Sequence, residues 1–335
     1  MAGIVLEVGA DADLGLVHNA LRGCGVWGRT LGGALGSHSG ARVVVLEGHS
    51  KEVNLGVLLD IPGVLNVYRG SSPHPKVDEL RNRNIWVGSA LIGGDETPLL
   101  MAGPCSVESE EQIHQCAAMV KRCGGRVLRG GAFKPRTSPY AFSGAGKEAL
   151  GWLRDAALAH DLGVVTEVMS EREVDSVARA ADLIQVGSRN MQNFALLGAV
   201  GAQKKPVLLK RGMAASVEEW LLAGEHLLAA GCSSVIFCER GIRSFDDTTR
   251  NLLDLSAVAL LRHVHGLRVV VDPSHGTGRR DLIAPMSKAA LAAGADGLLL
   301  EVHVNPAEAV SDGPQALRES ELENLSQDLG LLLPA

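Results

Sequence analysis

The strongest constraint on the fold is a strand-then-helix pattern that repeats eight times between Pro98 and the C-terminus. Each short apolar segment is followed by an amphipathic helical pattern, as in 111–123 and 217–230. Eight such units in about 240 residues predict a (β/α)8 TIM barrel over 98–335. An open doubly wound sheet is the alternative, but it requires a GxGxxG turn after an early strand, and that spacing is absent there. The predicted strands are 99–102, 126–128, 164–166, 183–186, 207–209, 235–237, 269–271 and 297–300.

A smaller unit precedes the barrel. Residues 1–70 show the order strand, helix, strand, strand, helix, strand, which is typical of a small α/β ferredoxin-like domain. The first helix is expected to begin near Asp11 or Asp13, and Ser50 is expected to cap the second. The polar segment 71–84 is predicted to be a linker, and two short apolar runs after it predict a hairpin, so that 71–97 connects the two domains.

Charge and hydropathy exclude several classes of protein. The formal net charge is -6 and aromatic residues make up only 3% of the chain, which argues against binding of nucleic acid or of an anionic membrane. No apolar run reaches the roughly 18 residues of a membrane span. The N-terminus has no basic segment or long apolar core, so we expect no signal peptide and a cytoplasmic location.

Basic residues follow the predicted barrel strands. In a (β/α)8 barrel the carboxyl ends of all strands meet at one mouth. Cations gathered there repel one another unless an anion joins them, and Arg matches phosphate and carboxylate oxygens well. We therefore predict a strongly anionic, phosphate-bearing substrate; the alternative is a set of salt bridges to loop carboxylates. The cations are Arg129, Lys134, Arg136, Arg189, Lys210 and Arg240.

Four potential metal ligands also follow strands that are neighbours in a closed barrel. Cys105 follows the first strand, His275 the seventh, and Glu301 and Asp312 the eighth. Because the eighth strand closes against the first, a thiolate, an imidazole and two carboxylates are brought together, which suits a divalent metal. Taken singly, each has an ordinary structural interpretation: a buried Cys, for example, often acts as a small apolar side chain.

These strand ends carry a resemblance to a known family. The chain resembles 3-deoxy-D-arabino-heptulosonate-7-phosphate (DAHP) synthase of type I beta, including members with an N-terminal ferredoxin-like regulatory domain. The motifs run through the barrel in order: Gly103-Pro104-Cys105-Ser106, Arg129 to Ser138, Val165-Thr166-Glu167, Gly187 to Asn190, Leu209 to Gly212, Cys238 to Gly241, Val271 to His275 and Leu300 to His303.

The resemblance implies the activity of 3-deoxy-7-phosphoheptulonate synthase, a transferase of aldol type. Phosphoenolpyruvate, erythrose 4-phosphate and water would give DAHP and phosphate, the first step of the shikimate pathway, on the route to chorismate and the aromatic amino acids. The implied metal ligands are Cys105, His275, Glu301 and Asp312, with Mn²⁺ expected ahead of Co²⁺, Zn²⁺, Fe²⁺ or Cd²⁺.

The resemblance also implies roles for the remaining site residues. Those expected to act in catalysis are Lys134, Glu167 and His275, with Lys134 and Glu167 handling the protons of the water. The positions matching the phosphoenolpyruvate site are Arg129, Lys134, Arg189, Lys210 and Arg240. Those matching the erythrose 4-phosphate site are Arg136, Thr137 and Ser138.

Two alternative functions remain open, and an oligomer and an effector are also expected. A related barrel, 3-deoxy-D-manno-octulosonate 8-phosphate synthase, uses arabinose 5-phosphate and typically reads Lys-Ala-Asn-Arg-Ser where this chain has Lys134 to Ser138. A non-catalytic metabolite sensor would tolerate the loss of a ligand or cation, and none is lost. We expect a homodimer or homotetramer, with allosteric feedback by tyrosine or phenylalanine through residues 1–70.

Overall fold

The computed structural model describes residues 3–31, 41–47, 53–94, 97–134 and 144–332. Contacts between Cα atoms divide the chain into two compact units, Met1–Pro75 and Lys76–Ala335. Each is described separately below. Within the described ranges, no helix combines the length and the apolar character that a membrane crossing requires.

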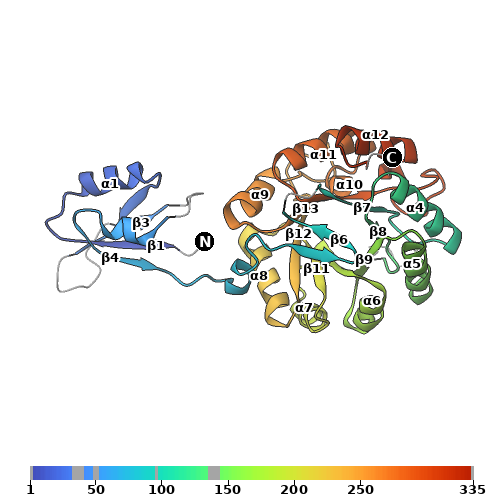
Figure 1. The fold of residues 1–335 in the computed structure, drawn as a ribbon, viewed down its shortest axis with the longest axis horizontal. Helices are drawn as coiled ribbons and strands as arrows, with labels where there is room; N and C mark the ends of the chain where they lie inside the picture. The colour runs from blue at the N-terminus through green and yellow to red at the C-terminus, as the bar shows by residue number, and fades with distance from the viewer. Residues whose placement is uncertain (1–2, 32–40, 48–52, 95–96, 135–143, 333–335) are drawn as a thin grey trace. The chain divides into compact units, whose positions relative to one another are not determined.

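The N-terminal unit is a four-stranded antiparallel sheet with two helices (Figure 1). Its elements are β1 (Ile4–Val8), α1 (Leu14–Gly23), β2 (Gly28–Leu31), β3 (Arg42–Leu46), α2 (Leu55–Leu59) and β4 (Val64–Arg69). The strand order β2-β3-β1-β4 is that of a ferredoxin-like domain, as predicted. Leu6, Val17 and Leu58 are fully buried in one core that joins the sheet to both helices.

The two helices of this unit begin at side-chain caps. The Asp13 carboxylate accepts a hydrogen bond from the backbone N–H of Gly15 at 2.8 Å, which satisfies a donor left free at the start of α1. Asn54 caps α2 in the same way, through Gly56 at 2.9 Å. The prediction that Ser50 caps the second helix is therefore wrong: an Asn four residues later supplies the acceptor, and Ser50 itself lies outside the described residues.

The second unit is a closed parallel barrel, which confirms the predicted fold. Its strands pair in the cyclic order β10-β11-β12-β13-β14-β7-β8-β9, so the last strand in sequence lies beside the first. Glu301 is in register with Gly103 across that closing pair. The strands are β7 (Leu99–Gly103), β8 (Val127–Arg129), β9 (Gly163–Val168), β10 (Leu183–Val186), β11 (Pro206–Lys210), β12 (Ser234–Glu239), β13 (Val269–Val271) and β14 (Gly297–Glu301).

Helices surround the barrel strands (Figure 1). Alternate side chains along a strand point to opposite sides, so Leu100 packs outward against the helices while Met101 faces the barrel interior. The α-helices are α4 (Glu110–Arg122), α5 (Lys147–Ala159), α6 (Val174–Ala180), α7 (Phe194–Gly201), α8 (Val217–Ala229), α9 (Leu255–Ala259), α10 (Pro273–Thr277), α11 (Ile283–Ala292) and α12 (Glu319–Asp328). A π-helical segment follows α9 at Leu260–His265, and 3₁₀ turns occupy Glu171–Glu173, Ser188–Asn190, Arg280–Leu282 and Gly313–Gln315.

The predicted hairpin closes the amino-terminal end of the barrel. It consists of β5 (Ile85–Val87) and β6 (Ala90–Ile92), whose alternate side chains share a core with the inward-facing residues of the barrel strands. The Cα of Gly163, at the start of β9, lies so close to the hairpin that a Cβ there would meet the carbonyl oxygen of Val87 at 2.9 Å. The hairpin is thus part of the barrel unit.

Of the predicted linker, residues 71–84, only the first part lies outside the barrel unit. Residues 76–84 belong to the barrel unit, and a short helix, α3 (Pro75–Asp78), lies at their start. Val77 and Leu80 are buried in the barrel's outer core, and the Glu225 carboxylate accepts the backbone N–H of Val77 at 2.9 Å. The sequence did not predict this packing, because the segment is mostly polar and only two apolar side chains, Val77 and Leu80, pack against the barrel.

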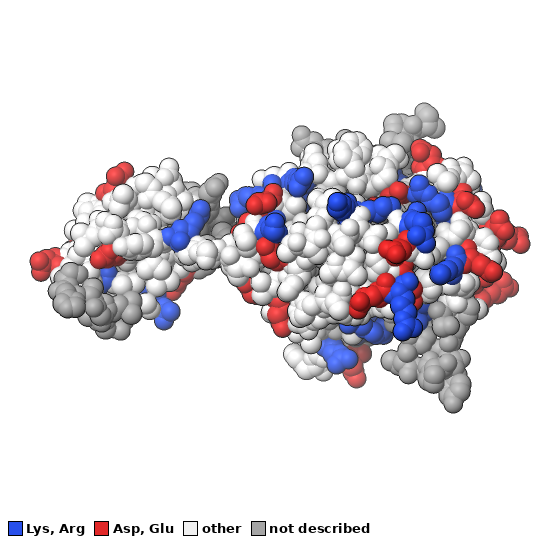
Figure 2. Space-filling model, turned by 90° about the horizontal axis from the view of Figure 1, so that it is seen from below, with Lys and Arg blue, Asp and Glu red and all other residues white. Residues whose placement is uncertain are grey.

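Charges on one face of the barrel unit are mixed in sign. Figure 2 shows one face of the molecule, where basic and acidic side chains are interspersed over the barrel unit. That pattern on this face agrees with the small formal net charge of -6.

Candidate active site

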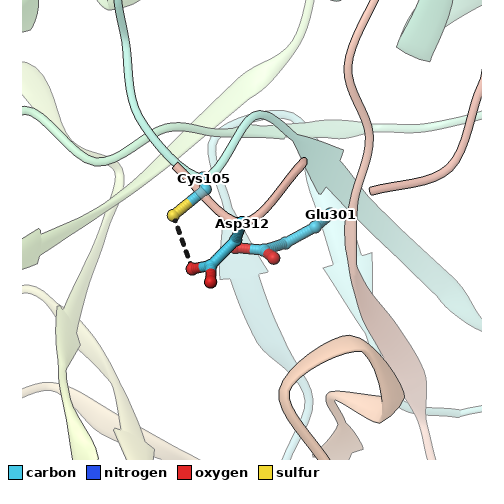
Figure 3. Close-up of side chains that lie close together, drawn as sticks. All are labelled: Cys105, Glu301 and Asp312. Carbon is cyan, nitrogen blue, oxygen red and sulfur yellow. Dashed lines mark hydrogen bonds between the residues drawn. The ribbon is translucent and has the colours of Figure 1, made fainter. Parts of the chain in front are cut away.

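Three potential metal ligands meet at the carboxyl-terminal mouth of the barrel (Figure 3). Cys105 follows β7, Glu301 ends β14, and Asp312 lies in the loop beyond β14. One ligand atom from each lies within 4.8 Å of the others, and the Cys105 thiol contacts a carboxylate oxygen of Asp312 at 3.1 Å. The closure of β14 against β7 brings these residues together from positions about two hundred apart in sequence.

The fourth predicted ligand, His275, lies directly beside this cluster. It sits in α10, and its Nε2 is 3.2 Å from Oε1 of Glu301. Its Nδ1 is 2.7 Å from Oδ2 of the buried Asp272, whose other oxygen accepts the backbone N–H of His275 at 2.9 Å. A carboxylate on one ring nitrogen fixes the orientation of an imidazole, and here it directs the other nitrogen toward the ligand cluster.

Glu301 is completely buried, and three polar side chains surround it. Arg129 donates to Oε1 at 3.0 Å, and Gln315 donates a short hydrogen bond to Oε2. Burial acts to raise the pKa of Glu301, but His275 and Arg129 outweigh it and hold that pKa below its ordinary value. Glu301 is therefore an anion at neutral pH, the form that binds a metal.

The pKa of the Cys105 thiol shifts in the opposite direction. Burial, reinforced by the charge of Glu301, raises its pKa to about 12, although Lys134 partly opposes the shift. The Nζ of Lys134 lies 3.2 Å from the sulfur. Without a metal the thiol is thus protonated at neutral pH, and a bound cation would have to displace that proton.

A pocket opens from the ligand cluster, and most of the predicted cations line it. Its walls include the metal-ligand candidates Cys105, His275 and Asp312, the carboxylate Glu167, and the basic residues Lys134, Arg189, Lys210, Arg240 and Arg250. Arg129 lies in an adjoining pocket that shares Lys134 and Glu167 with this one. Strands far apart in sequence thus direct most members of both sets of predicted residues to one cavity.

Salt bridges account for some of these cations but not for all. Arg129 pairs with Glu301, and Lys210 pairs with Asp272 at 2.6 Å; all four side chains are buried. Among the described residues, by contrast, no carboxylate lies within salt-bridge distance of Arg189 or Arg240. One guanidinium nitrogen of Arg240 is buried and has no hydrogen-bond partner in the described chain. Such an unpaired buried donor is costly, and an anionic ligand would satisfy it.

Glu167 projects from β9 into the same cavity. Its carboxylate accepts a hydrogen bond from Gln185 at 3.3 Å, and it packs so closely on Gly187 that a Cβ there would lie 1.9 Å from a carboxylate oxygen. A side chain at position 187 would therefore displace the Glu167 carboxylate from this place.

The donor set fits a divalent transition metal. A thiol, an imidazole and two carboxylates combine soft and hard ligands, as sites for Mn²⁺, Fe²⁺, Co²⁺ or Zn²⁺ do. Two of the four, His275 and Glu301, carry the supporting hydrogen bonds that orient metal ligands.

Comparison with known proteins identifies the family. The model of the DAHP synthetase I family matches residues 76–330, which is most of the chain and includes every residue of the site. This chain belongs to the DAHP synthetase I family. The resemblance of the barrel sequence to DAHP synthase is thereby confirmed.

Individual relatives agree with this assignment. A phospho-2-dehydro-3-deoxyheptonate aldolase of Thermotoga maritima is 49% identical over 251 residues, which cover 75% of this chain and 74% of the relative. A crystal structure of a DAHP synthase from that organism matches with a TM-score of 0.74 and 37% identity, over 98% of this chain and 97% of the other. A 2-dehydro-3-deoxyphosphooctonate aldolase of Geobacter sulfurreducens is 30% identical over 74% of this chain and 96% of its own length.

Sequence reasoning missed three residues of this family member's site. Asp272 bridges Lys210 and His275, Gln315 holds Glu301, and Arg250 donates to Gln315 at 3.2 Å. The sequence offered a signal for Asp272, since it directly follows a barrel strand and lies three residues before His275. No sequence pattern pointed to Gln315 or Arg250, because they lie after strands in segments whose paths the sequence does not specify. The predicted residues Arg136, Thr137 and Ser138 lie outside the described residues.

Proposed function

We propose that this chain condenses phosphoenolpyruvate with erythrose 4-phosphate and water to give DAHP and inorganic phosphate. The observation that carries the proposal is that one pocket joins a thiol–imidazole–carboxylate cluster to several basic side chains. The former suits a metal that activates an aldehyde, and the latter suit a small polyanion. The name of the Thermotoga relative supports the same reaction.

The basic side chains would hold phosphoenolpyruvate. Arg189 and Arg240 are without carboxylate partners in the described chain, and they could pair with its phosphate and carboxylate groups. Lys210 and Arg129 would add positive charge near the substrate while keeping their ion pairs with Asp272 and Glu301. Fixing two anionic substrates in one pocket removes much of the entropic cost of a two-substrate reaction.

Cys105, His275, Glu301 and Asp312 would hold the metal ion, for which we propose Mn²⁺. When bound, such an ion would supply Lewis-acid polarisation of the aldehyde oxygen. In the proposed reaction, C3 of phosphoenolpyruvate attacks the aldehyde carbon, water adds at C2, and phosphate leaves.

Glu167 and Lys134 are proposed to move the protons of the added water. Both line the pocket, and they approach it from neighbouring strand ends, β9 and β8. Glu167 is held on one side by Gln185, so its carboxylate keeps a defined direction. A carboxylate and an ammonium group at the same water provide an acceptor and a donor for proton transfer.

The acceptor sugar is the point on which the related enzymes differ. Relatives 30% identical to this chain are named for an eight-carbon product, whereas the sequence Lys134 to Ser138 favours the four-carbon acceptor. Phosphate release should therefore be measured with erythrose 4-phosphate and with arabinose 5-phosphate, before and after chelation. We expect turnover with the first sugar only, and its loss on chelation. Turnover with arabinose 5-phosphate alone would favour the octulosonate reaction.

The N-terminal unit is proposed to regulate the barrel. Every proposed ligand and cation lies in the other unit, so the first 75 residues are not needed for the chemistry itself. We propose feedback by tyrosine or phenylalanine through this unit, in a homodimer or homotetramer.

A further inference from the structure

A buried ionic cluster lies behind the pocket, among residues that do not line it. Nη1 of Arg211 is 3.1 Å from Glu239 and 2.8 Å from Asp254. Glu239 is fully buried and the Arg211 side chain is 6% exposed. Burying such charges is expensive, and an apolar pair would cost less, so the cluster calls for an explanation other than stability.

The position of the cluster supplies that explanation. Arg211 immediately follows Lys210 on β11, and Glu239 immediately precedes Arg240 after β12. The ion pair therefore joins the chain neighbours of two pocket cations. Adjacent residues of an extended strand point to opposite sides, and Arg211 accordingly lies over the ring of Trp220 in α8, 5.8 Å from its centroid.

Further hydrogen bonds extend the cluster into both loops. The second oxygen of Glu239 accepts the backbone N–H of Gly241 at 2.7 Å, so the carboxylate clamps the turn on which Arg240 is carried. Nε of Arg211 donates to the carbonyl of Ala215 at 3.1 Å, which fixes the loop after Lys210. Asp254 caps α9 through Ala257 at 3.1 Å.

Arg240 is the cation that most needs such support. Its guanidinium lacks a carboxylate within salt-bridge distance among the described residues, and one of its nitrogens has no hydrogen-bond partner there. The Arg240 side chain is buried, but no ion pair to a described carboxylate fixes its direction before a ligand binds. The backbone from which it extends is held by Glu239.

We propose that Arg211 and Glu239 form a positioning pair, which fixes Lys210 and Arg240 in the relative placement that phosphoenolpyruvate requires. This inference rests on the proposed function, because it names residues that set affinity for the proposed anionic substrate. Neither residue touches that substrate.

The test compares two buried pairs of the same kind. Arg268 and Asp296 form an ion pair at 2.9 Å, with side chains 4% and 6% exposed. The Asp296 carboxylate also accepts a backbone N–H, that of Val269, at 2.9 Å. This control pair lies at the starts of β13 and β14, the end of the barrel away from the pocket. Glu239→Gln and Asp296→Asn are thus matched substitutions at opposite ends of the barrel.

Binding of phosphoenolpyruvate to the full-length protein is measured by calorimetry, with Mn²⁺ binding and thermal unfolding alongside. We expect Glu239→Gln to weaken phosphoenolpyruvate binding about tenfold, as small misplacements of binding groups do. Mn²⁺ affinity should be unchanged. Asp296→Asn should lower the melting temperature but leave phosphoenolpyruvate affinity within about twofold, since distant sites act independently.

Asp254→Asn serves as a milder second variant if Glu239→Gln does not fold. Asn remains a good helix cap, while Arg211 loses one of its two carboxylates, and we expect about threefold weaker binding. Equal affinities in the wild type and the variants at Glu239 and Asp254 would overturn the positioning role. Failure of the wild type to bind phosphoenolpyruvate would instead contradict the proposed function.

Discussion

At the scale of single residues, Cys105 is the most informative ligand to change. We expect Cys105→Ala to lose bound metal and at least about a hundredfold in rate, because the remaining donors form an incomplete site. Metal content is measured on the purified protein, and activity before and after chelation and addition of Mn²⁺. Full activity of a metal-free Cys105→Ala protein would rule out the metal site.

The raised pKa of the Cys105 thiol predicts a pH dependence of metal binding. Since that pKa is about 12, the thiol is protonated throughout the neutral range and binding must release its proton. Metal affinity should therefore rise with pH by up to about tenfold per unit from this group. Calorimetry of Mn²⁺ binding in buffers of different ionisation enthalpy measures the released proton. The Cys105→Ser variant should release fewer protons, and equal release from both proteins would contradict the assignment.

Arg240 and Arg129 are predicted to behave differently when truncated to Ala. Arg240→Ala should cost about 3 kcal/mol in kcat/KM, roughly a hundredfold, with little change in stability. Arg129→Ala should also destabilise the fold by about 3 kcal/mol, because it leaves buried Glu301 without its partner. Steady-state kinetics and denaturant unfolding of both variants measure this contrast. If both variants lose the same free energy of unfolding, the Arg129–Glu301 ion pair does not stabilise the fold.

At the scale of elements, the hairpin β5–β6 is predicted to be indispensable to the barrel. A chain beginning at Lys76 should fold, because residues 76–94 supply their own contacts with the barrel core. A chain beginning at Pro98 should be destabilised by several kcal/mol, at about 1.5–3 kcal/mol for each buried aliphatic side chain removed. Denaturant unfolding of the two truncated proteins compares them, and equal stability would show that the hairpin is dispensable.

Elements and strand ends could be predicted from sequence because they depend on short-range patterns. Short apolar segments followed by helical periodicity located all eight barrel strands, and barrel closure then placed Cys105 beside Glu301. The buried partners could not be predicted in this way. Gln315 reaches Glu301 only because of the path of a loop, and Arg211 contacts Glu239 through the register of β11 with β12. Such contacts depend on tertiary geometry that no local pattern encodes.

At the scale of the whole molecule, the N-terminal unit is expected to affect regulation and not the chemistry. If tyrosine or phenylalanine inhibits the full chain, a protein beginning at Lys76 should retain activity and lose that inhibition. The reason is that the proposed catalytic residues all lie within Lys76–Ala335. Inhibition curves for both proteins provide the measurement. Equal inhibition would place the effector site on the barrel.

The central claim, that this pocket joins phosphoenolpyruvate to a four-carbon aldehyde, is tested most directly by a competition experiment. The full chain with Mn²⁺ is given phosphoenolpyruvate and equal amounts of erythrose 4-phosphate and arabinose 5-phosphate in ¹⁸O-water, and the products are weighed by mass spectrometry. The account predicts the seven-carbon product and unlabelled phosphate, because water attacks carbon and not phosphorus. A predominant eight-carbon product, or ¹⁸O in the phosphate, would contradict it.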